Sequence, residues 1–183
     1  MADLVTTAEA QSFLGVTGYD TLIGELIDYV TAGIESYTGR YFTATSVTEY
    51  IDGGGDALVV SRPPIISVTS ISDHHDTDAL LASTNYETEL SAGMIVGSPS
   101  ADSTMISVNP WASGRRRWKV VYSSGYASIP ANVKLAALTW LADIFANRQG
   151  AKSESLGDRS FTVDDTMPSR VKLLLSTYKD IVV

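Results

Sequence analysis

The sequence predicts an α+β protein whose helices form both ends of the chain and whose strands form the middle. Apolar residues recur at the spacing of an amphipathic helix before residue 40 and again after residue 126. Between about residues 41 and 124 they alternate with polar residues, as in strands with one buried face. We therefore expect a single domain over residues 1–183. It would be mainly a helical bundle, formed by the N- and C-terminal helices (1–40 and 126–183), with a central β-hairpin or small β-sheet insertion.

Two helices are expected in the N-terminal part. Thr6 and Glu9 have the spacing of a capping box, which opens a short helix that Gly15 ends. Asp20 can cap a second helix, and Gly39 supplies its C-terminal stop. The residues expected on the inner face of this second helix are Leu22, Leu26, Tyr29, Val30, Gly33, Ile34 and Tyr37.

The central block opens with alternating residues at Val47–Ile51, followed by the glycine-rich run 52–56 and a second apolar run. Because glycine adopts positive φ readily, this pattern predicts a β-hairpin. The Pro63–Pro64 pair ends the second strand, after which we expect a strand at 65–72 and a polar loop at 73–83. Further short strands are expected at 86–90, 94–96, 105–108 and 117–122.

Two more helices are expected in the C-terminal part, one after Pro130 and one after Pro168. The buried face of the first is expected to hold Val133, Ala136, Ala137, Trp140, Leu141, Ile144 and Phe145. Leu135, Leu138 and Ala142 form a second apolar line beside that face. A helix that is apolar on two sides needs two neighbours, and in a short chain one of them can be another subunit. These three residues are the candidate subunit interface.

The composition, 44% apolar and 19% charged over 183 residues, indicates a globular protein. No cysteine is present, which excludes disulfides and zinc–thiolate sites. The N-terminus lacks the basic and apolar regions of a secretory signal, and no segment approaches the ~20 apolar residues of a membrane span. We expect a soluble protein that is made in the cytoplasm and contacts no membrane.

The net negative charge of the chain arises entirely from its first third. Residues 1–60 hold nine acidic residues and one basic residue, Arg40, for a net charge of −8, whereas residues 61–183 are neutral overall. Such a surface repels nucleic acid, because affinity for DNA depends mainly on neutralising phosphates. A DNA-binding role is therefore not expected, while a role beside DNA without adhesion stays open.

No residue pattern predicts catalysis or a cofactor. The only histidines, His74 and His75, form a metal-like cluster with Asp73 and Asp76, a composition that suits zinc or manganese. Adjacent side chains diverge in an extended loop, so a solvated loop is favoured over a metal site. No nucleophile motif accompanies these histidines. The run Gly53–Gly55 lacks the lysine of a phosphate-binding loop and does not lead into a helix.

Two charged groups in the central block allow a functional interpretation beside a structural one. Arg115–Arg117 near Trp111 and Trp118 resembles a patch that contacts phosphates and stacks bases, but a solvated edge or a contact with acidic protein surface is favoured. Glu87 and Glu89 share one strand face about 7 Å apart by strand rise, a separation compatible with glycoside hydrolysis. No aromatic cleft pattern supports that chemistry.

An acidic group lies on one side of the second helix and comprises Glu25, Asp28 and Glu35. One interpretation is a hydrated outer face. The other is a negative strip that faces a channel, which has meaning only if many copies form a ring.

The chain ends in an apolar group, Ile181, Val182 and Val183, just past an amphipathic helix that carries Tyr178. Fraying is the usual fate of a terminus. The alternative is an apolar peg that docks on a partner.

Several segments, taken in order, resemble the head–tail connector, or adaptor, proteins of tailed bacteriophages. These segments are LVTTAEAQSFLGV, IESYTGRYF, YIDGGGDALVVSRPPIISVTSISD, VVYSSGYASIPANVKLAALTWLADIFANR and PSRVKLLLSTYKD. Each segment by itself shows only hydrophobic spacing and a turn, but the combination in this order is specific to the family. Together the segments span about two thirds of the chain. Residues 73–115 are not distinctive.

The resemblance implies a structural protein of the virion neck, made in the bacterial host cytoplasm. It implies a ring, usually of twelve copies, between the portal and the stopper or tail-completion protein, with DNA crossing its central channel and no catalytic residue or cofactor. The alternatives are a tail terminator or stopper of the virion, or a small ligand-binding or metal-dependent enzyme domain that uses the β block. The residues assigned to portal docking are Tyr178, Ile181, Val182 and Val183.

Overall fold

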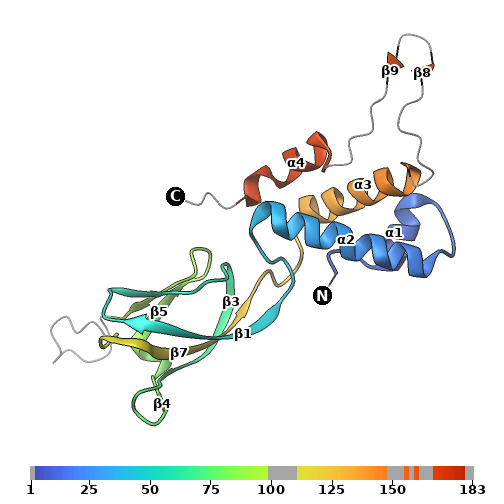
Figure 1. The fold of residues 1–183 in the computed structure, drawn as a ribbon. Helices are drawn as coiled ribbons and strands as arrows, with labels where there is room; N and C mark the ends of the chain where they lie inside the picture. The colour runs from blue at the N-terminus through green and yellow to red at the C-terminus, as the bar shows by residue number, and fades with distance from the viewer. Residues whose placement is uncertain (1–2, 99–110, 148–154, 157–158, 161–166, 180–183) are drawn as a thin grey trace. The chain divides into compact units, whose positions relative to one another are not determined.

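The computed structural model describes residues 3–98, 111–147, 155–156, 159–160 and 167–179 (Figure 1). The chain forms two compact units. A helical unit combines both ends of the chain, Met1–Phe42 and Ser128–Val183, and a β unit holds Thr43–Ala127.

The first two helices of the helical unit begin and end close to where the sequence predicts. Helix α1 (Thr7–Leu14) opens with the expected capping box between Thr6 and Glu9, and Gly15 ends it in the left-handed conformation. Helix α2 (Asp20–Thr38) ends at Gly39, whose φ is 71°. The cap of α2 differs from the expectation, because Tyr19, at a φ of 61°, precedes the helix and no side chain caps it.

The C-terminal helices also follow the prolines that predict them. Helix α3 (Ala131–Asn147) begins after Pro130, whose carbonyl accepts hydrogen bonds from the amides of Val133 and Lys134. Helix α4 (Ser169–Leu175) follows Pro168 and continues into the 3₁₀ turn η2 (Ser176–Tyr178). Strands β8 (Ser155–Leu156) and β9 (Arg159–Ser160) pair with each other in an antiparallel ladder.

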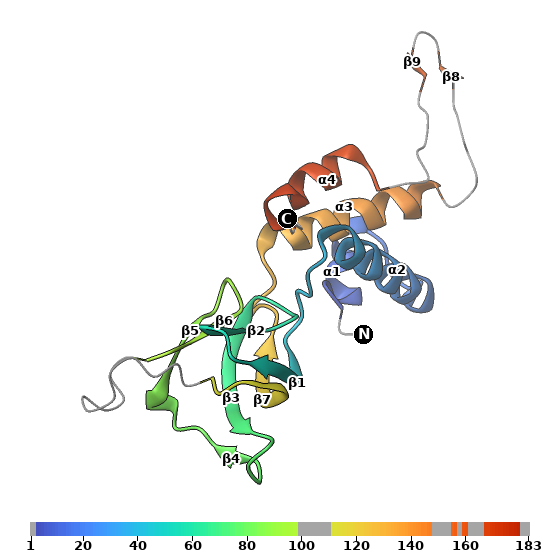
Figure 2. The same ribbon diagram turned by 60° about the vertical axis from the view of Figure 1, so that its left-hand side comes forward.

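Helix α3 lies at the centre of the helical unit and contacts α1, α2 and α4, as Figures 1 and 2 show. The indole ring of its Trp140 packs against Gly33 of α2. A Cβ atom added to Gly33 would lie 2.6 Å from the ring carbon Cζ3. Tyr29, one turn earlier on α2, rests on the same indole with ring centroids 5.6 Å apart. A glycine is therefore required at this helix crossing because the indole fills the space of a side chain.

The buried face of α2 is displaced from the one that the sequence predicts. The structure buries Ile23, Ile27, Val30, Thr31, Ile34 and Thr38. Val30 and Ile34 are confirmed, but Leu22 and Leu26 are only half-buried and Tyr29 is exposed. Both sets of residues have helical spacing, and the sequence does not reveal which set faces the protein's own core.

The β unit consists of two antiparallel sheets around a shared core. One sheet has the strand order β1-β7-β3-β4 and the other β2-β6-β5. A 3₁₀ turn, η1 (Ser83–Asn85), precedes β5. The strands are β1 (Thr45–Gly53), β2 (Ala57–Val59), β3 (Ile65–Asp73), β4 (Ala79–Leu80), β5 (Tyr86–Glu89), β6 (Met94–Gly97) and β7 (Gly114–Ser124).

The two sheets share one hydrophobic core. Its buried members are Leu58, Val60, Ile65, Ile71, Ile95, Trp111, Trp118, Val120 and Tyr122. A backbone hydrogen bond also links the two sheets, from the amide of Ile65 at the start of β3 to the carbonyl of Leu90, just after β5, at 2.8 Å. The expected strands at 65–72, 86–90, 94–96 and 117–122 are confirmed, and 105–108 lies outside the described residues.

The expected β-hairpin at residues 47–61 is wrong in its pairing. Strand β1 pairs with β7, and β2 pairs with β6 in the other sheet, although the chain does turn back at the glycine run. Where hairpin ladder bonds would form, the Glu49 carboxylate accepts hydrogen bonds from the amide of Ser61 at 3.0 Å and from its hydroxyl group. The Tyr122 hydroxyl group also donates to Glu49 at 2.7 Å. Burial and this carboxylate raise the pKa of Tyr122.

The expectation of a mainly helical bundle with a small β insertion is also wrong. Of the residues that the structure describes, about 39% are helical and 29% lie in strands, and the β unit has its own core. Strand β7 forms ladders with both β1 and β3, which precede it by more than forty residues in the chain. Local alternation identifies strands but does not reveal such long-range partners. The prediction from the sequence therefore underestimated the extent of the β structure.

No helix in the described part of the chain has the length and apolar character needed to cross a membrane.

The contact between Gly33 and Trp140 can be tested with two alanine substitutions in α2. Gly33→Ala is expected to lower the free energy of unfolding by about 1–3 kcal/mol, because the new methyl group overlaps the indole. Gly24→Ala, where nothing lies within 4 Å of the added Cβ, is expected to raise it by about 0.5–1 kcal/mol. Chemical denaturation measures both, and equal effects of the two substitutions would contradict the packing.

Candidate subunit interface

Glu9 fastens helix α1 to helix α3. Its carboxylate accepts a hydrogen bond from the amide of Thr6 at 2.8 Å, which completes the capping box. The other carboxylate oxygen accepts one from the ammonium group of Lys134, on the first turn of α3, at 2.7 Å. Gln11 holds the next segment through its amide group, which donates to Gly18 and Asp20 at 2.8 Å. The orientation of α1 is therefore set by polar contacts, since Ala10 is its one fully buried residue.

These contacts lower the pKa of Glu9 from an ordinary value of 4.5 to about 2. The hydrogen bond from Lys134 is the largest cause, followed by the backbone hydrogen bond from Thr6. Because the folded-state pKa is depressed, the pair stabilises the protein above pH 4.5 and loses this effect as the pH falls toward 2.

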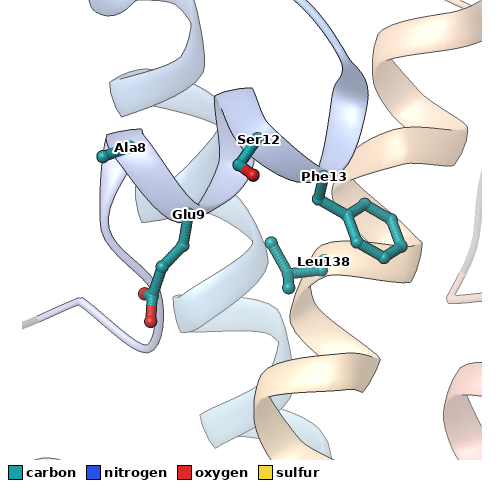
Figure 3. Close-up of a pocket in the computed structure, with 5 residues that line it drawn as sticks. All are labelled: Ala8, Glu9, Ser12, Phe13 and Leu138. Carbon is teal, nitrogen blue, oxygen red and sulfur yellow. The ribbon is translucent and has the colours of Figure 1, made fainter.

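An open groove of about 710 Å³ runs between α1 and α3 and is lined by Ala8, Glu9, Ser12, Phe13 and Leu138. Figure 3 shows the Phe13 ring of α1 beside Leu138 of α3. Phe13 remains 48% exposed and Leu135, one turn before Leu138, remains 45% exposed. An aromatic ring and two leucines thus form an apolar surface. We call Phe13, Leu135, Leu138 and Ala142 the α1–α3 face.

Helix α3 carries no unpaired charge beside this surface. Its two charged residues are Lys134, bound to Glu9, and Asp143, bound to Arg170 of α4. The side of α3 that faces away from its buried residues holds Ala131, Leu135, Leu138, Thr139, Ala142 and Ala146. An exposed helix surface without charge is typical of a protein contact rather than a hydrated face.

The structure therefore brings Leu135, Leu138 and Ala142 together on one side of α3, with Leu135 exposed and the other two half-buried. The sequence analysis missed Phe13, which α1 adds to the same surface. Spacing gave no signal for Phe13, because Phe13 and Leu14 both lie at helical spacing from the buried Ala10, three and four residues after it. That these residues contact another subunit stays a prediction.

The acidic group lies on α2. Glu25 and Asp28 are exposed and Glu35 is half-buried. All three are displaced from the buried residues of the helix, with Glu25 pointing most directly away from them at helical spacing. The structure is thus compatible with either of the two interpretations of this group.

Tyr178 lies in η2, where its ring packs edge-on against Phe42 with centroids 5.7 Å apart. It is half-buried and is held within the helical unit. Ile181, Val182 and Val183 lie outside the described residues, so their role in portal docking stays a prediction.

The charged groups of the β unit form local contacts. Arg117 binds Asp73 through Nε and Nη2, at 2.7 Å for the shortest contact, and this hydrogen bonding lowers the pKa of Asp73. Arg116 lies over the Tyr50 ring, 5.4 Å from its centroid. Trp111 and Trp118 are 1% and 4% exposed. Because both indoles belong to the core, they do not offer the base-stacking surface that a nucleic-acid patch requires.

The metal-like cluster does not converge in the structure. His74 contacts Asp78 at 3.0 Å, and Asp73 faces Arg117 instead. Among the residues that the structure describes, no three His, Asp or Glu side chains are grouped so as to hold a metal ion. Glu87 and Glu89 are both exposed on β5, and the Ser98 hydroxyl group donates to Glu87 at 3.2 Å.

Comparison with protein families identifies the chain. The profile of the head completion protein family matches residues 3–181, nearly the whole length. The chain belongs to the head completion protein family. The expected relationship to phage head–tail connectors is thereby confirmed. Members of this family are structural parts of the virion.

Solved structures show the same fold at low sequence identity. A chain in the neck of an empty gene transfer agent (GTA) particle, computed with C6 symmetry, is 17% identical, with a TM-score of 0.62 over 98% of this chain and 91% of that one. A chain in the native GTA virion is 16% identical, with a TM-score of 0.61 and coverage of 98% and 91%. A chain in the native GTA neck, computed with C12 symmetry, is 16% identical, with a TM-score of 0.59 and coverage of 97% and 89%. Comparison with curated proteins gave no match.

The Glu9–Lys134 pair makes a testable contribution to stability. Glu9→Gln is expected to lower the free energy of unfolding at pH 7 by about 0.5–1 kcal/mol, a modest value because both side chains are partly exposed. The difference from wild type should disappear as the pH falls from 4.5 toward 2. Urea denaturation across this pH range measures the effect. Glu25→Gln, at an exposed position of α2, serves as control, and a difference that persists at pH 2 would contradict the assignment.

Proposed function

We propose that this head completion protein is a subunit of a ring in the virion neck, where it joins the portal to the stopper or tail and lets DNA pass through its channel. The observation that carries the proposal is the uncharged, partly exposed α1–α3 face, in a chain of this family. The fold likeness to subunits of GTA necks computed with C6 and C12 symmetry supports a cyclic arrangement. Twelve copies agree with the higher of these symmetries.

Assembly, rather than catalysis, is the proposed work of the chain. In a cyclic ring each subunit uses one surface against the next subunit and a different surface against the previous one. The α1–α3 face is proposed as one of these surfaces, with Leu135, Leu138 and Ala142 at its centre. The helical and β units are proposed to act together as a single connector subunit.

We assign the acidic group of α2 to the contact with DNA and the C-terminus to the contact with the portal. Glu25, Asp28 and Glu35 are proposed to face the channel, where their negative charge prevents passing DNA from adhering. The segment from Tyr178 to Val183 is proposed to dock on the portal through its three terminal aliphatic residues.

The ring contact can be tested at Leu135, which is exposed and can be replaced without opening the core. Leu135→Asp is expected to weaken subunit association ten- to a hundredfold, since burying one leucine contributes about 1.5–3 kcal/mol. The number of copies per purified particle, measured by quantitative mass spectrometry, should fall accordingly. Leu173→Asp, at a leucine of α4 that is 75% exposed, is the matched control. Normal incorporation of the Leu135→Asp chain would discard this contact.

The channel assignment can be tested by reversing the charge of α2. Replacing Glu25, Asp28 and Glu35 with lysine should slow genome release at low ionic strength, because cations on a channel wall bind phosphates. Raising the salt concentration should restore the rate. A triple variant with Gln, Asn and Gln at these positions separates loss of charge from reversal. Release that is unchanged at low salt would rule out an acidic channel wall.

A further inference from the structure

Helix α2 presents three chemically different sides. Its buried residues, such as Ile27 and Ile34, face the core of the helical unit. The acidic group occupies a second side. Leu22, Leu26 and Tyr29 occupy a third, which we call the Tyr29 strip. By helical geometry the centres of the three sides are roughly 120° apart.

The Tyr29 strip is apolar but incompletely covered. Leu22 and Leu26 are half-buried, and Tyr29 is 56% exposed. Each residue of the strip comes one position before a residue that the core buries, Ile23, Ile27 or Val30, which rotates it by about 100° around the helix. The strip extends over about two helical turns. The helical unit therefore leaves part of an apolar helix surface in contact with solvent.

Tyr29 is also held in place before any partner arrives. Its ring rests on the Trp140 indole at a centroid distance of 5.6 Å, and that indole is fixed against Gly33. A ring that is already ordered loses little side-chain entropy when a partner covers it. Exposed tyrosines with this rigidity are typical centres of protein interfaces.

We propose that the Tyr29 strip of one subunit receives the α1–α3 face of the next subunit. This inference rests on the proposed ring and names the second of the two surfaces that a cyclic assembly needs. The occupant is a second copy of this chain, because the same chain carries both apolar surfaces, on different helices. The small residues Ala131, Ala142 and Ala146 on the exposed side of α3 allow a neighbouring helix to approach closely.

The charges at the borders of the two surfaces do not repel each other. Glu25 and Asp28 flank the Tyr29 strip and are exposed. Lys134 borders the α1–α3 face with its side chain 39% exposed, and Glu9, the acid nearest to it, is already bound to that lysine. Because this pair carries no net charge, the α1–α3 face brings no uncompensated acid beside Glu25 and Asp28, which stay on the proposed channel side, whereas contact between two α2 helices would place like charges together.

Cysteine cross-linking tests the pairing directly, because the chain contains no cysteine. The double variant Tyr29→Cys with Leu135→Cys is incorporated into particles and oxidised. If the two surfaces meet, denaturing gels should show a ladder of covalent multimers up to the ring size. The control double variant, Leu173→Cys with Leu135→Cys, should stay monomeric. Particle imaging of the wild type first establishes whether a ring is present.

The outcomes separate this inference from the proposed function. Absence of a ring in wild-type particles overturns the proposed function. A ring that yields no ladder overturns the pairing alone, and so does a dimer from Leu135→Cys by itself, which would mean that two α1–α3 faces meet. If the double variant is not incorporated, single substitutions decide. Tyr29→Asp should lower the copy number per particle at least tenfold, while Ala32→Asp, on the acidic side of α2, should not; equal effects of the two would overturn the pairing.

Discussion

The packing of Trp140 against Gly33 determines how the helical unit presents its surfaces. The indole occupies the place of a missing side chain, so position 33 of α2 has no room for a larger residue at this crossing. That contact fixes the rotation of both helices. It thereby decides which side of α2 enters the core, and it leaves Tyr29 resting on the outer surface of the same indole.

Polar contacts then place the remaining helices around α3. Lys134 and Asp143 are the two charged residues of this helix, and each binds a residue of another helix, Glu9 of α1 and Arg170 of α4. The charges of α3 are thus used to position its neighbours. The side of α3 that faces away from its buried residues is uncharged, which is the property that the proposed ring contact requires.

The β unit contributes its own core and needs no help from the helices to bury its large residues. Trp111, Trp118 and Tyr122 lie among aliphatic residues from both sheets. Strands β1 and β2 belong to different sheets and do not pair. The carboxylate of Glu49 on β1 instead accepts hydrogen bonds from the amide of Ser61, just after β2, and from the hydroxyl group of Tyr122 on β7. Two arginines of the β unit make contacts within it, Arg117 with Asp73 and Arg116 with the ring of Tyr50.

The sequence by itself determined where the helices begin and end, since capping residues, prolines and glycines act within a few residues of their own position. The sequence also predicted most strands and the residues that α3 adds to the α1–α3 face. Its resemblance to head–tail connectors agrees with membership of the head completion protein family. Only the tertiary structure decided which of two equally spaced apolar strips on α2 is buried, which strands pair, and that Phe13 joins Leu138. These outcomes depend on contacts between residues far apart in the chain, and hydrophobic spacing along one element carries no information about its partner.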